Sequence, residues 1–156
     1  MYETEYKRKF LVVIDESPEC ERALTFAAYR VKRTGGTVVL MSLIQKPEFI
    51  GLGVEDVLRA EAVEEAERNL DARLARIRDI GDVRTESVIR EGEGAEEIER
   101  VIDEDRDIAI LVLAASISNE GPGPLVNHFA NRANALPIPL TIVPGRMSDE
   151  EIIAIC

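Results

Sequence analysis

The chain contains 156 residues, of which 46% are hydrophobic, and its 30 acidic and 19 basic residues give a formal net charge of −11. This length is enough for one domain with a substantial core. The negative charge opposes binding to nucleic-acid phosphates and to anionic membranes, so we expect no nucleic-acid partner and no membrane partner.

The N-terminus and the apolar runs bear on where the protein resides. The first five residues include Glu3 and Glu5 and are not followed by an apolar core, which argues against a secretory signal. The apolar runs fall far short of a bilayer span. The sequence therefore predicts a soluble, cytoplasmic protein.

The first predicted strand covers residues 10–15, a continuous apolar run that ends in the carboxylate of Asp15. Such a run is typical of a strand buried on both faces of a parallel sheet. Ser17 is placed to cap the helix that follows, with Pro18 in its first turn. The apolar residues of this helix recur three or four apart and form one stripe: Cys20, Leu24, Ala27, Ala28 and Val31.

Two more elements and a loop complete the first half of the chain. Residues 37–43 are β-branched and apolar and predict a second buried strand. Residues 45–53 contain Pro47 and two glycines and predict a mobile loop. The longest helix is expected over residues 55–80, where apolar residues mark an inner face and charged residues the rest.

The second half continues the alternation of strands and helices. Residues 83–90 are diluted by charges and predict a strand near a sheet edge. Residues 108–114 form the most apolar run and predict a central strand. The other predicted elements are a loop over residues 91–94, a helix containing Ile98, Val101 and Ile102, a loop over residues 116–124, a helix marked by Leu125, Phe129, Ala133 and Leu136, and a last strand over residues 139–143.

Five strands alternating with four helices predict a single-domain, Rossmann-like α/β fold with three layers, in which helices cover both faces of a parallel sheet. This domain is assigned to residues 1–147. Ser148 and Glu151 then have the spacing of a capping box, and three isoleucines follow within four residues. We therefore expect a short, apolar helical tail over residues 148–156.

Reactive side chains are few. Cys20 and Cys156 have no His or Cys nearby at a metal-ligand spacing, so we expect free thiols and no metal site. Cys20 begins a predicted helix and is either a small core residue or a thiol made reactive by the helix dipole. His128 is the only histidine and no Ser-His-Asp order supports it. We therefore expect no catalytic residue.

Two places qualify as a ligand site. Asp15 and Ser116 each follow a predicted parallel strand, and ligands bind beyond the carboxyl ends of such strands. Gly121, Gly123 and the helix that follows them could form an anion cradle, with Asn127 as a further donor. The alternative is that Gly-Pro-Gly-Pro only shapes a stiff turn, because prolines lack the amide donors that a cradle uses.

Four stretches together resemble the universal stress protein family, over roughly residues 9–144. They are residues 11–17 with Ala23-Leu24, residues 38–43, residues 90–92 with 95–98, and residues 110–115 ending in 136–143. The resemblance implies a sheet in the order 3-2-1-4-5 and a homodimer formed through the last strand. Some members of the family bind ATP above strands one and four.

The same resemblance assigns site residues, and it also shows a departure. Asp15 matches the acidic residue that contacts the nucleotide in ATP-binding members, and Leu43 matches an apolar position beside the base. Those members carry a glycine-rich phosphate motif after the fourth strand, whereas this chain has Val126-Asn127 where a glycine and a hydroxyl residue would lie. Val126 would crowd an anion, two prolines remove donors, and no Lys or Arg occurs between Arg106 and Arg132.

The leading hypothesis is therefore a noncatalytic stress-response module that acts as a homodimer on an unidentified protein partner, with weak or absent ATP binding. The alternative is an ATP-binding switch that hydrolyses ATP slowly or not at all. In that alternative Asp15 holds the nucleoside and the loop containing Gly121 and Gly123 holds the phosphates. A dinucleotide-dependent dehydrogenase fits worse, because no G-x-G-x-x-G follows the first strand.

Overall fold

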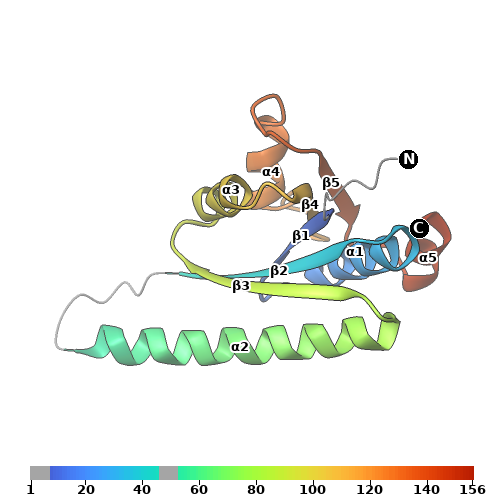
Figure 1. The fold of residues 1–156 in the computed structure, drawn as a ribbon. Coiled ribbons are helices and arrows are strands. Elements are labelled where there is room, and N and C mark those ends of the chain that lie inside the picture. The colour runs from blue at the N-terminus through green and yellow to red at the C-terminus, as the bar shows by residue number, and fades with distance from the viewer. Residues whose placement is uncertain (1–7, 46–52) are drawn as a thin grey trace.

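The structure is a computed structural model that describes residues 8–45 and 53–156 (Figure 1). Five strands alternate with helices along the chain and form one parallel sheet in the order β3-β2-β1-β4-β5. This confirms the α/β fold and the strand order. The elements are β1 (Lys9–Ile14), α1 (Cys20–Thr34), β2 (Thr37–Ile44), α2 (Val54–Ile80), β3 (Arg84–Glu91), α3 (Gly94–Glu104), β4 (Ile108–Ala115), α4 (Pro124–Asn131), β5 (Leu140–Pro144) and α5 (Asp149–Ile155).

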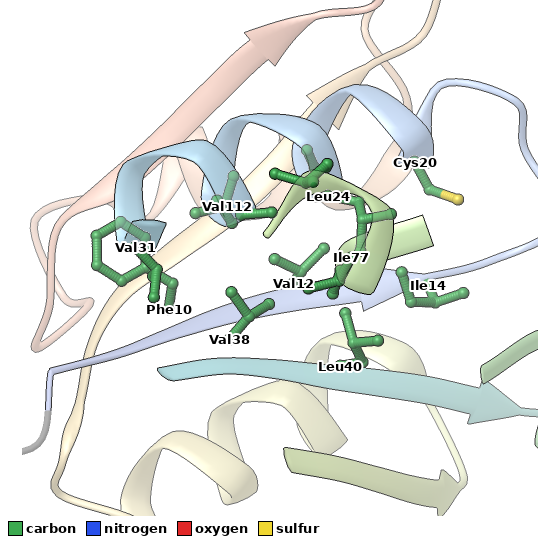
Figure 2. Close-up of a cluster of buried hydrophobic side chains, with 14 of the residues drawn as sticks. Phe10, Val12, Ile14, Cys20, Leu24, Val31, Val38, Leu40, Ile77 and Val112 are labelled. Atoms are coloured by element: carbon green, nitrogen blue, oxygen red, sulfur yellow. The ribbon is translucent and has the colours of Figure 1, made fainter. Parts of the chain in front are cut away.

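Helices cover both faces of the sheet, as the apolar runs predict. Side chains alternate across a strand, so Phe10, Val12 and Ile14 of β1 pack with α1 and α2, and Figure 2 shows them pointing toward the α1 side chains. Leu11 and Val13 point to the other face and pack with α3 and α4. The two hydrophobic clusters lie on opposite sides of β1 and β4, which places the centre of the sheet in the core.

The two edges of the sheet differ in character. β3 forms one edge, and its first four residues, Arg84 to Ser87, are polar and exposed. The predicted edge strand is thereby confirmed. β5 forms the other edge, where the side chain of Ile142 is 39% exposed. Only the β3 edge carries the charges that discourage pairing with another strand.

The start of α1 differs from the prediction. Ser17 does not cap this helix, which begins at Cys20 after turns and has no side-chain cap. The amide and the hydroxyl of Ser17 instead donate to Asp15 Oδ1, over 2.8 Å and 2.5 Å. Asp15 takes this role because an Asp side chain readily accepts hydrogen bonds from the residue two positions on.

The helix after β4 is also shorter than predicted. α4 ends at Asn131, and Ala133 and Leu136 lie in turns closed by hydrogen bonds to Ala130 and Arg132. The backbone leaves the helical conformation at Arg132, whose φ is −115° and ψ 21°. Leu136 still packs against the cluster beside α3 and α4, but from a turn.

The C-terminal helix α5 docks on its own chain. Its predicted capping box is confirmed by hydrogen bonds between Ser148 and Glu151 in both directions. Asp149 is bonded to Arg22 of α1 at 2.8 Å and to Arg76 of α2 at 3.2 Å. Ile152 is fully buried in the cluster beneath α1, while Ile153 and Ile155 are exposed.

Two remaining predictions concern the loop and the membrane. The predicted loop over residues 45–53 falls mainly on residues 46–52, which lie outside the described residues. Within residues 8–45 and 53–156, none of the helices combines the length and the apolar character needed to cross a bilayer.

Candidate functional site

Two neighbouring cavities lie beyond the carboxyl ends of the strands. The small cavity, of about 240 Å³, is bounded by the ends of β1 and β4 and by the start of α4. The large cavity, of about 680 Å³, lies between the ends of β1 and β2, the middle of α2 and the start of α3. Both are lined by Asp15, Pro124 and Leu125. This is the point where the strand order reverses, which is where ligands bind in open α/β sheets.

Asp15 is central to both cavities because β1 ends directly before it. Its Oδ1 accepts the two hydrogen bonds from Ser17, and its backbone carbonyl accepts one from the thiol of Cys20 at 3.6 Å. These bonds hold the turn after β1 with its exposed carboxylate at the mouth of the cavities. A ligand hydroxyl or amine could donate to such a carboxylate.

The electrostatics of both cavities are negative. Glu19 lines the small one, while Glu16, Glu65 and Glu93 line the large one. Hydrogen bonding from Ser17 lowers the pKa of Glu19, and the amides of Glu96 and Ala95 lower the pKa of Glu93. Among the residues that the structure describes, no lysine or arginine lines either cavity. The cavities therefore disfavour an anionic ligand.

The loop after β4 uses much of its own hydrogen-bonding capacity. The amide of Ser116 donates to the carbonyl of Pro122 at 2.9 Å, and the amides of Ser118 and Glu120 donate to serine hydroxyls within the loop. Pro122 and Pro124 have no amide hydrogen to offer. Three amides of the loop are therefore bonded within it and two of its positions have no amide hydrogen, which agrees with a loop that shapes a turn.

The structure brings together four of the six predicted site residues. Asp15, Ser116 and Gly123 line the small cavity, and Leu43 lines the large one with Asp15. Gly121 and Asn127 line neither. Asn127 lies on the exposed face of α4, because Val126 and Phe129 occupy its buried face. The amide of Asn127 is already bonded to the carbonyl of Gly123 at 3.0 Å.

Several lining residues were not predicted as part of the site. Leu125 lines both cavities, and α2 contributes Ala62 and Ala66 to the large one. The only signal for these residues in the sequence was the apolar stripe that also marks core positions. Gly94 gives a more specific signal, because a Cβ there would lie 3.2 Å from Leu43 Cδ1. A side chain larger than alanine at the start of α3 would therefore displace Leu43 beside the cavity.

Two candidate reactive side chains among the described residues are Cys20 and His128. Cys20 lines the small cavity but is 3% exposed, and burial raises the pKa of its thiol. A raised pKa opposes thiolate formation, so the side chain behaves as a core residue. His128 Nε2 lies 3.6 Å from Glu99 Oε1, away from both cavities. Within the described part of the chain, no three His, Cys, Asp or Glu residues are grouped to hold a metal ion.

Comparison with solved structures finds the same fold in several proteins, two of which are named as universal stress proteins. UspA from Lactobacillus plantarum is 18% identical, with a TM-score of 0.72 over 88% of this chain and 97% of that one. The hypothetical protein MJ0577 is 20% identical, with a TM-score of 0.75 over 92% of this chain and 99% of that one. The universal stress protein from Archaeoglobus fulgidus, in complex with dAMP, is 18% identical, with a TM-score of 0.64 over 88% of this chain and 98% of that one.

The sequence comparisons identify the family. A search of curated protein sequences gave no match. The model of the universal stress protein family, in contrast, matches residues 7–144, which include all five strands and the helices α1 to α4. This chain therefore belongs to the universal stress protein family.

Proposed function

We propose that this chain is a noncatalytic stress-response module that acts as a homodimer on other proteins, and that it binds ATP weakly or not at all. The observation that carries the proposal is the negative lining of the two cavities at the carboxyl end of the sheet. Asp15, Glu19 and Glu93 contribute carboxylates there, and no cation among the described lining residues offsets them. A triphosphate would have to approach this charge without compensation.

Steric and hydrogen-bonding features support the same proposal. Val126 lines the small cavity, at the position where the family resemblance assigns a glycine to ATP-binding members, and any Cβ there restricts the approach of a phosphate to the backbone. The amide of Ser116 is already bonded within the loop. Positive charge is a main means by which proteins hold phosphates, and none of the described lining residues of either cavity supplies it.

The asymmetry of the sheet edges supports a homodimer through β5. The β5 edge exposes Ile142, whereas the β3 edge exposes charged and polar side chains. An open, apolar edge strand favours pairing with a second strand. Ile153 and Ile155 of α5 offer further exposed apolar area that a partner subunit or another protein could cover.

A nucleotide-binding switch is the second candidate function. It is supported by the position of the cavities at the strand-order reversal and by the relative from Archaeoglobus fulgidus solved with dAMP. Asp15 would hold the nucleoside in this case. The two candidates differ in one measurable quantity, the affinity for ATP.

Isothermal titration with ATP and magnesium tests the proposal. We expect a Kd weaker than about 100 μM, which corresponds to less than roughly 5.5 kcal/mol of binding free energy. Glu19→Gln removes one charge with little change of shape and should tighten any residual binding. A wild-type Kd well below this limit, lost in Asp15→Asn, would establish the switch and reject the proposal.

Light scattering on the purified chain tests the dimer. We expect the mass of two chains, and we expect Ile142→Glu to give monomers because it places a charge on the β5 edge. Ser87→Glu places the same charge on the β3 edge and should leave the dimer intact. A monomeric wild-type chain, or equal effects of the two variants, would contradict dimer formation through β5.

A further inference from the structure

A third cavity, of about 640 Å³, opens at the opposite end of the sheet, where strands β1, β2 and β3 begin. Its walls are the connection from α1 to β2 and the connection from α2 to β3. Arg8, Lys32 and Arg84 line it together with Thr37, and we refer to it as the basic cavity. Asp82 is the one carboxylate among its described lining residues. The lining of the basic cavity is therefore net positive, whereas the whole chain has a net charge of −11.

The three cations of the basic cavity come from three different elements. Arg8 directly precedes β1, Lys32 lies in the last turn of α1, and Arg84 is the first residue of β3. In the part of the chain that the structure describes, neither Arg8 nor Arg84 has a carboxylate within 4.0 Å. The adjacent Lys9 contrasts with them, because it pairs with both Glu86 and Asp105. Two arginines with no carboxylate partner among the described residues, beside one cavity, create a local positive potential in an acidic protein.

Hydrogen bonds and glycines hold this end of the sheet in place. The amide of Thr37 donates to the carbonyl of Arg8 at 2.9 Å, and Thr37 is in register with Arg84 on β3. Gly36 has φ +122°, and a Cβ there would lie 2.5 Å from the Arg8 carbonyl oxygen, so only glycine allows this close approach. The starts of the three strands are therefore fixed relative to one another.

Lys32 is positioned as well. Its ammonium donates to the carbonyl of Ile80 at 2.9 Å and lies 5.8 Å from the centre of the Tyr29 ring. Its aliphatic stem lies over Gly81, where a Cβ would be 3.0 Å from Lys32 Cδ. An ammonium group has three N–H donors, so the bond to Ile80 leaves others available. Helix-dipole complementation alone explains a lysine in the last turn of α1, but it does not explain Arg8 and Arg84 at the same cavity.

We propose that the basic cavity binds a small ligand that carries a phosphate group. Guanidinium groups donate two parallel hydrogen bonds to phosphate oxygens, and a lysine ammonium adds a compact charge. Thr37, which is 7% exposed, places a hydroxyl residue among these cations. The proposal concerns the end of the sheet opposite Asp15 and is independent of the function proposed for the other end.

A ¹⁵N-labelled full-length chain titrated with inorganic pyrophosphate at low ionic strength tests this proposal. We expect saturable shifts of the amide signals of Arg8, Thr37 and Arg84, and no shift for Asp15 or Gly123. Added sodium chloride should weaken the binding, because screening reduces the attraction between exposed charges. This readout separates the two ends of the sheet, so its failure is distinct from failure of the function proposed above.

Charge-removing variants sharpen the test. Arg8→Gln and Arg84→Gln should each weaken pyrophosphate binding by about tenfold or more, the scale of a lost charge-assisted hydrogen bond. Both residues are exposed, so the variants should keep the wild-type unfolding midpoint. Arg68→Gln, at an exposed position of α2 outside the cavity, removes the same charge and should change the Kd less than about twofold.

Three outcomes of these pyrophosphate titrations would overturn the proposal. They are the absence of saturable shifts, equal weakening by Arg68→Gln and Arg84→Gln, and shifts centred on Gly123.

Vesicles of phosphatidylcholine with about one quarter phosphatidylserine test a lipid headgroup as the source of the phosphate. We expect no sedimentation with them, because a net charge of −11 opposes approach to an anionic surface. Vesicle binding that pyrophosphate does not displace would reject a small ligand.

Discussion

Lys9 Nζ lies 2.7 Å from Asp105 Oδ2 and thereby ties the first strand of the sheet to the connection between α3 and β4. The same ammonium lies 2.9 Å from Glu86 on the edge strand β3. Lys9 is buried, while both carboxylates reach solvent. One side chain therefore connects three segments that are distant in sequence.

The first prediction concerns the pH dependence of this contact. Hydrogen bonds to Asp105 and then Glu86 raise the pKa of Lys9 above its usual 10.5. A raised pKa gives stability that is fully present below pH 10.5 and is lost as the pH rises through the folded-state pKa. We expect the free energy of unfolding in urea to fall above about pH 10.5.

The variant Lys9→Met should lower the free energy of unfolding by about 1–2 kcal/mol at neutral pH and lessen its decline at alkaline pH. An unchanged alkaline decline in this variant would contradict the assignment.

The second prediction concerns Gly145, which follows β5. A Cβ at this position would lie 2.3 Å from the Ala115 carbonyl oxygen and 2.8 Å from Ile117 Cγ2. Gly145→Ala should therefore reduce the free energy of unfolding by about 1–3 kcal/mol, as overpacking does. Gly94→Ala is the matched control, because its Cβ would meet only the flexible ends of Leu43 and Leu125. Equal stability of the two variants would show that the backbone near Gly145 adapts freely.

The third prediction separates docking of α5 from association between chains. Ile152→Ala removes a fully buried side chain and should cost about 2–4 kcal/mol in urea unfolding. Ile155→Ala changes a side chain that is 58% exposed and should cost less than about 0.5 kcal/mol. If α5 also contributes to a dimer, Ile155→Ala should weaken dimerisation measured by light scattering at low concentration. A similar loss of stability in both variants would contradict the docking seen here.

The fourth prediction concerns the start of α3. The side chain of Glu93 accepts hydrogen bonds from the amides of Ala95 and Glu96, at 3.2 Å and 2.8 Å. These bonds lower its pKa below the usual 4.5, so its contribution is present above that pH and is lost on acidification. Glu93→Ala should destabilise the chain by about 1 kcal/mol at pH 7, the usual cost of losing an N-cap.

Glu96→Ala is the control for this variant, because Glu96 lies in the same first turn of α3 but does not cap it. It should have a smaller effect than Glu93→Ala. The difference between the variants should shrink as the pH falls below about 4.5. A constant difference between pH 7 and pH 3 would show that ionisation of Glu93 is unimportant.

The regular elements were predictable from the sequence because their apolar spacing reflects burial directly. The runs that form β1 and β4 are buried on both faces, and the stripe of α1 packs on the sheet. The ends of the helices were less predictable, since they depend on competing local bonds. Ser17 bonds to Asp15 instead of capping α1, and neither residue type reveals this preference by itself.

The candidate site was predictable where it follows strand ends and unpredictable where it depends on packing between distant segments. Asp15 and Ser116 directly follow β1 and β4, and the carboxyl ends of neighbouring parallel strands meet at one edge of the sheet, where the small cavity lies. The contribution of α2 to the large cavity depends on how that helix crosses the sheet. The basic cavity was not predicted at all, because Arg8 and Arg84 are brought together only by the pairing of strands.

The unequal edges of the sheet also limit how these molecules can assemble. A strand-to-strand contact through β5 would use the same surface on both subunits, so two chains would cover both β5 edges. The sheet edges left open would then be the two charged β3 edges. Such an assembly is closed and does not propagate into fibres. In the dimer proposed above, the arginine and glutamate side chains of β3 would therefore face outward and oppose the addition of further chains.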